Sequence, residues 1–295
     1  MSETPTKEPA VKPHSTRRRL LVLRDRPGRL AYLTLTAVMF FSIFPLYYSL
    51  VVASRDNAAL AETPPPLTPG ANLWENTVRV FDTVPFGAAL ANSAIVSTTV
   101  ALSTVLFSTL AGFAFARLRF KGSRVLLVGV IATMMVPMQL GVIPLYMLMV
   151  RLGFADTLLA LILPALVNAF GVFFMTQYLS SALPAELIEA ARVDGASTLR
   201  VFWSIVLPAA RPAAVVLGVL TFLTAWNDYF WPLVVLSSPE SHTVQVSLST
   251  LAGGYVSDRS LVLTGTLLST LPLLAVFAVL GRHMISGIME GAVKG

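Results

Sequence analysis

Residues able to make or break covalent bonds are sparse in this sequence. Cysteine is absent, which excludes disulfides, thiol nucleophiles and cysteine metal sites. The three histidines, His14, His242 and His283, lie too far apart in the sequence for the spacing of a metal site. The P-loop pattern, the H-E-x-x-H zinc motif and the G-x-S-x-G elbow are also missing. We therefore expect no catalytic residue, no metal site and no cofactor bound by this chain.

The chemistry that remains is recognition, and it concentrates between Pro184 and Pro212. This stretch is the only long, evenly charged segment after the amino-terminal tail, and long apolar blocks precede and follow it. Its charged residues are Glu186, Glu189, Arg192, Asp194, Arg200 and Arg211.

The spacing within this stretch predicts a helix, a tight turn and a second helix. Pro184 suits a first helical position, and Asp194-Gly195 ends the helix because glycine tolerates the left-handed conformation. Ser197 can cap the second helix, on which Phe202 and Ile205 share one apolar face. A hairpin with one apolar and one charged face is suited to binding another protein.

The stretch resembles the EAA loop of ABC-importer permeases of the maltose type. In that family the loop is a coupling helix that docks on an ATP-hydrolysing subunit, and the resemblance implies a type I ABC-importer permease fold. An ordinary amphipathic cytoplasmic hairpin is the alternative. The residues that the resemblance assigns to ATPase coupling are Glu189, Ala190, Ala191, Asp194, Gly195, Ala196, Phe202, Ile205 and Pro208.

The elements that must position this hairpin are membrane spans. The chain has 295 residues, of which 55% are hydrophobic and only 12% charged, so we expect an all-α integral membrane protein. A span needs about 20 apolar residues. Six segments qualify, at about 30–54, 93–116, 125–150, 157–179, 213–236 and 261–281. Residues 30–281 are thus predicted to form one six-helix domain in the lipid bilayer.

The positions of lysine and arginine set the orientation. With the amino terminus inside, 17 of the 21 basic residues fall on the cytoplasmic side. Both termini and the 184–212 hairpin are then cytoplasmic, as in a multi-pass protein of a bacterial inner membrane. Residues 1–29 are expected to be a disordered basic tail and residues 282–295 a cytoplasmic tail. Because the basic residues flank apolar blocks, the net charge of +6 does not indicate nucleic-acid binding.

Polar side chains at membrane depth are candidates for a solute pathway, because such groups usually face a bundle interior or a cavity. Hydrogen bonding between helices is the alternative explanation, and for Asp228 so is a position in an interfacial aromatic belt. The pathway candidates are Gln139, Asn168, Gln177, Asn227 and Asp228.

The last outer loop contains Gly253, Gly254 and Tyr255. By resemblance these residues are candidates for contact with an external sugar-binding protein, and a flexible turn without a role is the alternative. The resemblance further implies a second homologous permease and two ATP-binding subunits that hold ATP and Mg²⁺. An ion-coupled secondary transporter and an intramembrane enzyme remain the other classes. The solute is not named by the sequence.

Overall fold

The part of the chain that the structure describes is helical. The computed structural model describes residues 28–61, 63–253 and 258–292, and within these ranges it contains helices and turns but no strand, which confirms the all-α prediction. The chain forms two compact units, residues 1–45 and 46–295. Helix α1 (Arg29–Ala53) crosses the boundary, and the remaining helices belong to the second unit.

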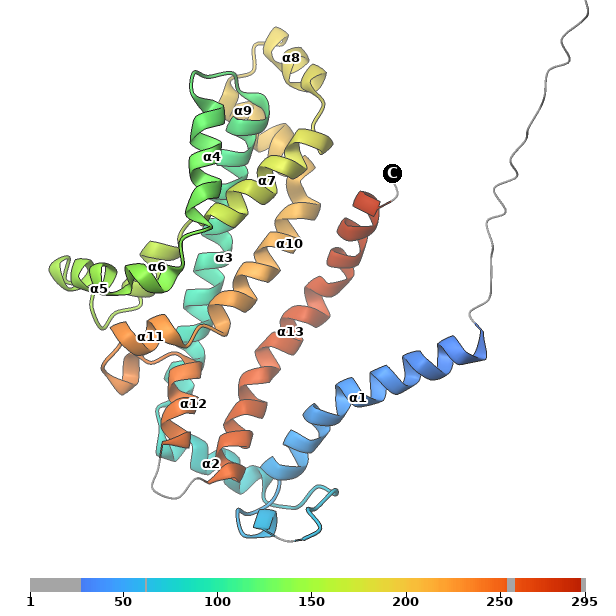
Figure 1. Ribbon diagram of the computed structural model, residues 1–295, viewed down its shortest axis with the longest axis vertical. Coiled ribbons are helices and arrows are strands. Elements are labelled where there is room, and N and C mark those ends of the chain that lie inside the picture. Colours follow the sequence, from blue (N-terminus) through green and yellow to red (C-terminus); the bar gives the residue numbers. More distant parts are fainter. Residues whose placement is uncertain (1–27, 62, 254–257, 293–295) are drawn as a thin grey trace, which may run out of the picture. The chain divides into compact units, whose positions relative to one another are not determined.

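Three long helices form the centre of the second unit. Helix α3 (Phe86–Arg117) packs against both α7 (Ala169–Ala182) and α10 (Leu207–Trp226), and α13 (Arg259–Ala292) packs against α10 (Figure 1). Small residues permit the closest approach. A Cβ atom at Gly112 of α3 would lie 2.8 Å from the carbonyl carbon of Met175 in α7, so only glycine fits there.

Up to six membrane spans are present in the described residues, in agreement with the predicted number. Five helical segments are long and apolar enough to cross a membrane alone. The sixth is a pair, α4 (Ser123–Thr133) with residues 138–151, bent by 90°. It ends in α5 (Val142–Arg151), and the break between the two pieces includes Pro137. Neither piece reaches the length of a span by itself.

The predicted boundaries of the fifth span are wrong. Instead of covering 213–236, the helical segment covers Thr198–Trp226, so the hairpin runs directly into the span and Asp228 lies beyond its end. A short helix, α11 (Phe230–Val235), follows. In a continuous helix the ring of Pro232 would clash with the carbonyl of Asp228, which favours a break before this point, and Pro232 instead lies in the first turn of α11.

Four further helical features were not predicted. Helix α6 (Leu159–Ala165) is separated from α7 by a break within the fourth span. Helices α2 (Leu73–Thr83) and α12 (Val244–Ala252) occupy segments expected to be outer loops. Helix α13 continues through residues 282–292, which were assigned to a tail. The predicted basic tail, up to residue 27, and Gly254 and Tyr255 lie outside the described residues.

Candidate functional site

The 184–212 stretch forms the predicted hairpin, and its first helix is α8 (Ala185–Val193). Pro184 is the residue before the helix rather than its first member, a difference of one position. The helix closes in a Schellman motif: the N–H of Gly195 donates to Arg192 O at 3.0 Å and that of Ala196 to Ala191 O at 2.9 Å. Gly195 has a φ of +77°, the left-handed conformation that the sequence predicted for it.

The second helix begins with the predicted cap. The hydroxyl of Ser197 accepts a hydrogen bond from the N–H of Arg200 at 3.3 Å, which opens α9 (Thr198–Val201). A π-helical turn, Phe202–Val206, joins α9 to α10. The turn ends just before Pro208, which has no N–H to donate, and single π turns of this kind are frequent at functional sites.

The hairpin is anchored to the ends of three long helices. Phe202 and Val206 are at most 1% exposed, and they join a buried cluster with residues of α3, α7 and α8. The rings of Phe113 and Phe202 lie 6.4 Å apart. Other members of the cluster are Met175, Leu179, Leu183, Ile188, Val201, Ala210 and Leu217. This packing fixes the hairpin against the ends of α3, α7 and α10.

Outside the buried cluster, the hairpin carries exposed apolar residues. Leu187, Val193, Leu199 and Trp203 are 49%, 88%, 64% and 54% exposed, respectively. Large exposed apolar areas mark interaction sites in proteins. We call these four residues the outer face of the hairpin.

The predicted coupling residues divide between these two sides. Ala191, Ala196, Phe202 and Ile205 pack on or within the buried cluster. Glu189, Ala190, Asp194, Gly195 and Pro208 are exposed. The structure thus separates a set that holds the hairpin in place from a set that another molecule can reach.

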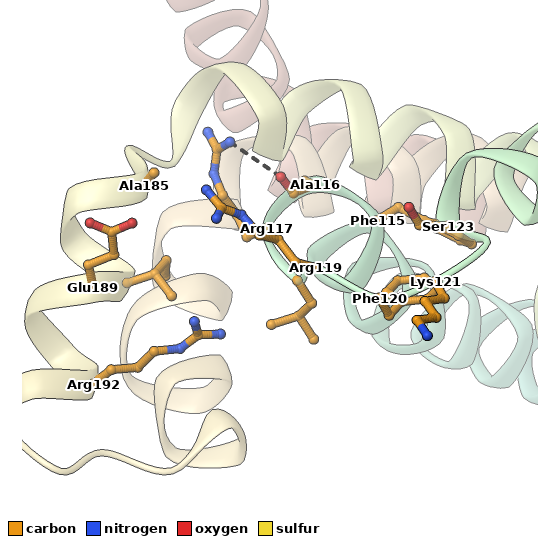
Figure 2. Close-up of a pocket in the computed structure, with 12 residues that line it drawn as sticks. Phe115, Ala116, Arg117, Arg119, Phe120, Lys121, Ser123, Ala185, Glu189 and Arg192 are labelled. Atoms are coloured by element: carbon orange, nitrogen blue, oxygen red, sulfur yellow. Dashed lines mark hydrogen bonds between the residues drawn. The ribbon is translucent and has the colours of Figure 1, made fainter.

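A cavity of about 930 Å³ lies between α8 and the turn that joins α3 to α4. Figure 2 shows Glu189 and Arg192 on the α8 side, with Arg117 and Arg119 across from them. Four of the twelve lining residues are cationic and one, Glu189, is acidic. We call this the basic pocket. Its charges entered the prediction of membrane orientation, but no local pattern in the sequence indicates that they meet.

One of the four cations is held by the protein and the others are not. Arg117 Nε donates to Leu183 O at 2.6 Å and Nη2 to Ser180 O at 2.9 Å, which ties the end of α3 to the end of α7. Its Nη1 donates to Ala116 O at 3.3 Å, the dashed line in Figure 2. The side chains of Arg119, Lys121 and Arg192 have no hydrogen-bond or ion-pair partner among the described residues.

A second cavity, of about 860 Å³, brings together two of the five pathway candidates. Asn168 and Asp228 line it, along with Phe170 and Trp231 in a mainly apolar wall. Asn168 also caps α7, because its Oδ1 accepts from Gly171 N at 2.7 Å. Gln139, Gln177 and Asn227 do not line this cavity, and the amide of Asn227 donates to Leu223 O at 2.8 Å.

At the other end of the bundle, a polar clamp orders the turn before α6 and the loop after α11. The carboxylate of Asp156 accepts from Ser237 N at 2.8 Å and Ser238 N at 3.0 Å, and from the hydroxyl of Ser238. These hydrogen bonds, led by the one from the Ser238 hydroxyl, lower the pKa of Asp156. The sequence analysis missed this clamp. Gly253, a predicted contact for a binding protein, directly follows α12 and is exposed.

Comparison with known proteins identifies relatives over most of the chain. Residues 86–288 match the family model described as "Binding-protein-dependent transport system inner membrane component". The lactose transport system permease protein LacG of Rhizobium radiobacter is 34% identical over 276 residues, which cover 93% of this chain and all of LacG. The arabinooligosaccharides transport system permease protein AraQ of Halalkalibacterium halodurans is 32% identical over 261 residues, covering 88% and 93%.

Two further matches extend the comparison. The sn-glycerol-3-phosphate transport system permease protein UgpE of Yersinia enterocolitica is 29% identical over 256 residues, covering 84% of this chain and 91% of UgpE. The solved structure of a bacterial ABC transporter involved in the import of the acidic polysaccharide alginate superposes with a TM-score of 0.74 at 24% identity, covering 86% of this chain and 94% of the matched chain. This last likeness supports the fold. The family match covers the central bundle and the hairpin, and the chain therefore belongs to the binding-protein-dependent transport system inner membrane components, the multi-pass permease subunits of ABC transporters.

Proposed function

We propose that this chain is the membrane-spanning permease subunit of an ATP-driven importer of sugars or sugar-like polyols, and that it forms half of the pathway. The relatives LacG, AraQ and UgpE are named for lactose, arabinooligosaccharides and sn-glycerol-3-phosphate, all small polyhydroxylated solutes. A second related permease would supply the other half, and an external binding protein would deliver the solute. The chain would lie in a bacterial inner membrane with both termini in the cytoplasm.

The observation that carries this proposal is the two-sided hairpin. Its inner side is buried against the ends of α3, α7 and α10, while its outer face, including Val193 and Trp203, is apolar and exposed. An ATPase subunit bound to the outer face would therefore move the ends of these helices with the hairpin as one body. Two ATPase subunits, holding ATP and Mg²⁺, would close and rock the paired permeases between inward and outward access.

The cavity lined by Asn168 and Asp228 offers a route for such solutes. Amide and carboxylate groups hydrogen-bond to hydroxyls, and the neighbouring rings of Phe170 and Trp231 supply flat apolar surfaces. We propose that Asn168 and Asp228 face the pathway. Gln139, Gln177 and Asn227 are weaker candidates because they do not line this cavity.

Replacing Gly195 by valine tests the coupling role. Gly195 has open space around it, so the change acts through its φ of +77°, which a β-branched residue adopts only with strain. We expect Gly195→Val to permit ATP hydrolysis but to reduce solute uptake at least tenfold in proteoliposomes that contain the whole complex.

Gly153→Val is the matched control. Gly153 has a φ of +73° and open space, but it lies in the turn after α5, far from the hairpin in sequence. It should lower thermal stability as much as Gly195→Val while uptake per hydrolysed ATP stays at the wild-type value. Unchanged uptake in Gly195→Val, or equal uncoupling in both variants, would contradict the coupling role of the hairpin.

A further inference from the structure

The basic pocket carries more positive charge than the hairpin needs for its own fold. Arg119, Lys121 and Arg192 come from two segments far apart in sequence and have no described partner, and Glu189 is the one carboxylate in the lining. We infer that the pocket binds the phosphate of an anionic phospholipid. Basic side chains next to a membrane span are attracted to anionic lipid headgroups.

Two helices begin at this pocket and add to its affinity for anions. Ser123, the first residue of α4, and Ala185, the first residue of α8, both line it. Neither Gly122 nor Pro184, the residue before each helix, provides a side-chain cap. Exposed N–H groups and the positive end of the helix dipole make such helix starts favourable places for a phosphate.

The pocket is also partly apolar, which favours a lipid over a water-soluble phosphate. Phe115, Leu118, Phe120 and Ile188 line it alongside the cations. The rings of Phe115 and Phe120 lie 5.8 Å apart and give an acyl chain an apolar surface beside Arg119 and Lys121. An amphipathic lining of this kind matches a ligand with a charged head and an apolar tail.

The position of the pocket at the end of a long apolar helix suits a lipid headgroup. It begins where the 32-residue helix α3 ends, at Arg117. The adjoining helix α4 exposes Val125, Leu126 and Val128, which are 75%, 57% and 60% accessible and form a surface suited to lipid tails. A lipid beside α4 can therefore place its phosphate in the pocket without leaving the bilayer interface.

Native mass spectrometry of the purified full chain, titrated with phosphatidylglycerol or phosphatidylcholine, tests this inference. We expect preferential binding of phosphatidylglycerol, and binding at least tenfold weaker in Arg119→Gln/Lys121→Gln, because each basic residue near an anionic headgroup contributes roughly a fivefold factor. Arg200→Gln/Arg211→Gln removes the same charge outside the pocket and should bind as the wild type does. Circular dichroism verifies that both variants remain folded.

Two competition arms identify the source of the phosphate. Displacement of phosphatidylglycerol only by other anionic lipids supports the inference. Displacement by inorganic phosphate at equal concentration would assign the pocket to a soluble anion and overturn it, as would equal binding of the two lipids. If the ATPase subunit shields Arg119 and Lys121 from chemical modification and lipid does not, the pocket belongs to a protein partner. That result would also overturn the inference. Because the lipid titrations use the isolated chain, their result does not depend on the proposed transport function.

Discussion

The hydroxyl of Ser238 donates a hydrogen bond to the carboxylate of Asp156, which lies 82 residues earlier in the sequence. The backbone reinforces this contact, because Asp156 N donates to Val235 O at 2.9 Å and Ser241 Oγ donates to Asp156 O at 3.2 Å. Asp156 has a φ of 59°, a left-handed conformation that aspartate tolerates better than most residues. One acidic residue thus joins the turn before α6 to the loop after α11.

The clamp should make stability depend on pH at the acid end. The hydrogen bonds from Ser238 and Ser237 lower the pKa of Asp156 from its ordinary value of 3.8. The resulting stabilisation is therefore complete above that ordinary pKa and disappears as the pH falls through the lower pKa of the folded state. We expect Asp156→Asn to lower the melting temperature at neutral pH, with the difference from wild type narrowing as the pH falls below 3.8.

Thermal unfolding in detergent from about pH 3 to about pH 8 measures this difference. Asp82→Asn is the control, since Asp82 is exposed and has no hydrogen bond or ion pair in the described part of the chain. Its melting curve should follow the wild type at every pH. A difference for Asp156→Asn that stayed the same down to the lowest pH would show that the carboxylate charge is not what holds the clamp.

Phe202 and Trp203 are neighbours in sequence but have opposite surroundings. Substitutions at these two positions therefore test separately how the hairpin is anchored and how it contacts a partner. Phe202 is 1% exposed within the cluster beneath the hairpin, whereas Trp203 is 54% exposed on the outer face. Phe202→Ala should lower the free energy of unfolding by about 3–5 kcal/mol, the usual cost of removing a buried aromatic ring. Trp203→Ala should change it by less than about 0.5 kcal/mol.

Trp203→Ala, which should leave stability unchanged, should instead weaken binding of the ATPase subunit. Trp203→Ala removes apolar surface from the proposed ATPase contact, and it should weaken co-purification of the ATP-binding subunit without altering the melting temperature. Ser204→Ala is the control, because Ser204 is an exposed residue on the same turn. This variant should co-purify with the ATPase subunit as the wild type does. Wild-type recovery of the ATPase with Trp203→Ala would remove the outer face from the coupling contact.

Gly112 should be the position where α3 is least tolerant of added volume. A Cβ there would meet Met175 Cβ at 2.9 Å and Thr176 N at 2.9 Å, and these atoms belong to or adjoin the α7 backbone and cannot move aside. We expect Gly112→Ala to destabilise the bundle by about 1–3 kcal/mol. Gly129→Ala in α4, where nothing lies within 4 Å, should be neutral or slightly stabilising. Equal melting temperatures for the two variants would refute the close packing of α3 on α7.

Local signals account for what could be predicted of the hairpin. The turn at Gly195, the cap at Ser197 and the apolar face that includes Phe202 depend on residues a few positions apart, and all three are confirmed. The end of α10 was misplaced because hydrophobicity continues through residue 236, whereas a helix continued to Pro232 would set its ring against the carbonyl of Asp228, and the chain breaks between α10 and α11 instead. A hydropathy pattern does not register that steric conflict.

Features that depend on distant contacts escaped prediction. Helix α2 buries Asn76, whose amide donates to Ala53 O at 2.9 Å and Arg55 O at 2.8 Å, and no pattern within residues 73–83 indicates those partners. The basic pocket likewise requires α8 to lie beside the turn after α3. The positions of charged residues along the sequence do not indicate that these two segments are close in space. The cavity shared by Asn168 and Asp228 arises in the same way.

The orientation of the hairpin can be tested directly because the chain has no cysteine, so a single introduced thiol is unambiguous. Val193 on the outer face is 88% exposed, and Leu152 in the turn after α5 is 53% exposed. The distribution of basic residues predicts that these two positions lie on opposite sides of the membrane. In intact cells a membrane-impermeant maleimide should label Leu152→Cys, and it should label Val193→Cys only after the membrane is permeabilised. Labelling of Val193→Cys in intact cells would put the hairpin outside, where no ATPase could reach it, and the coupling proposal would fail.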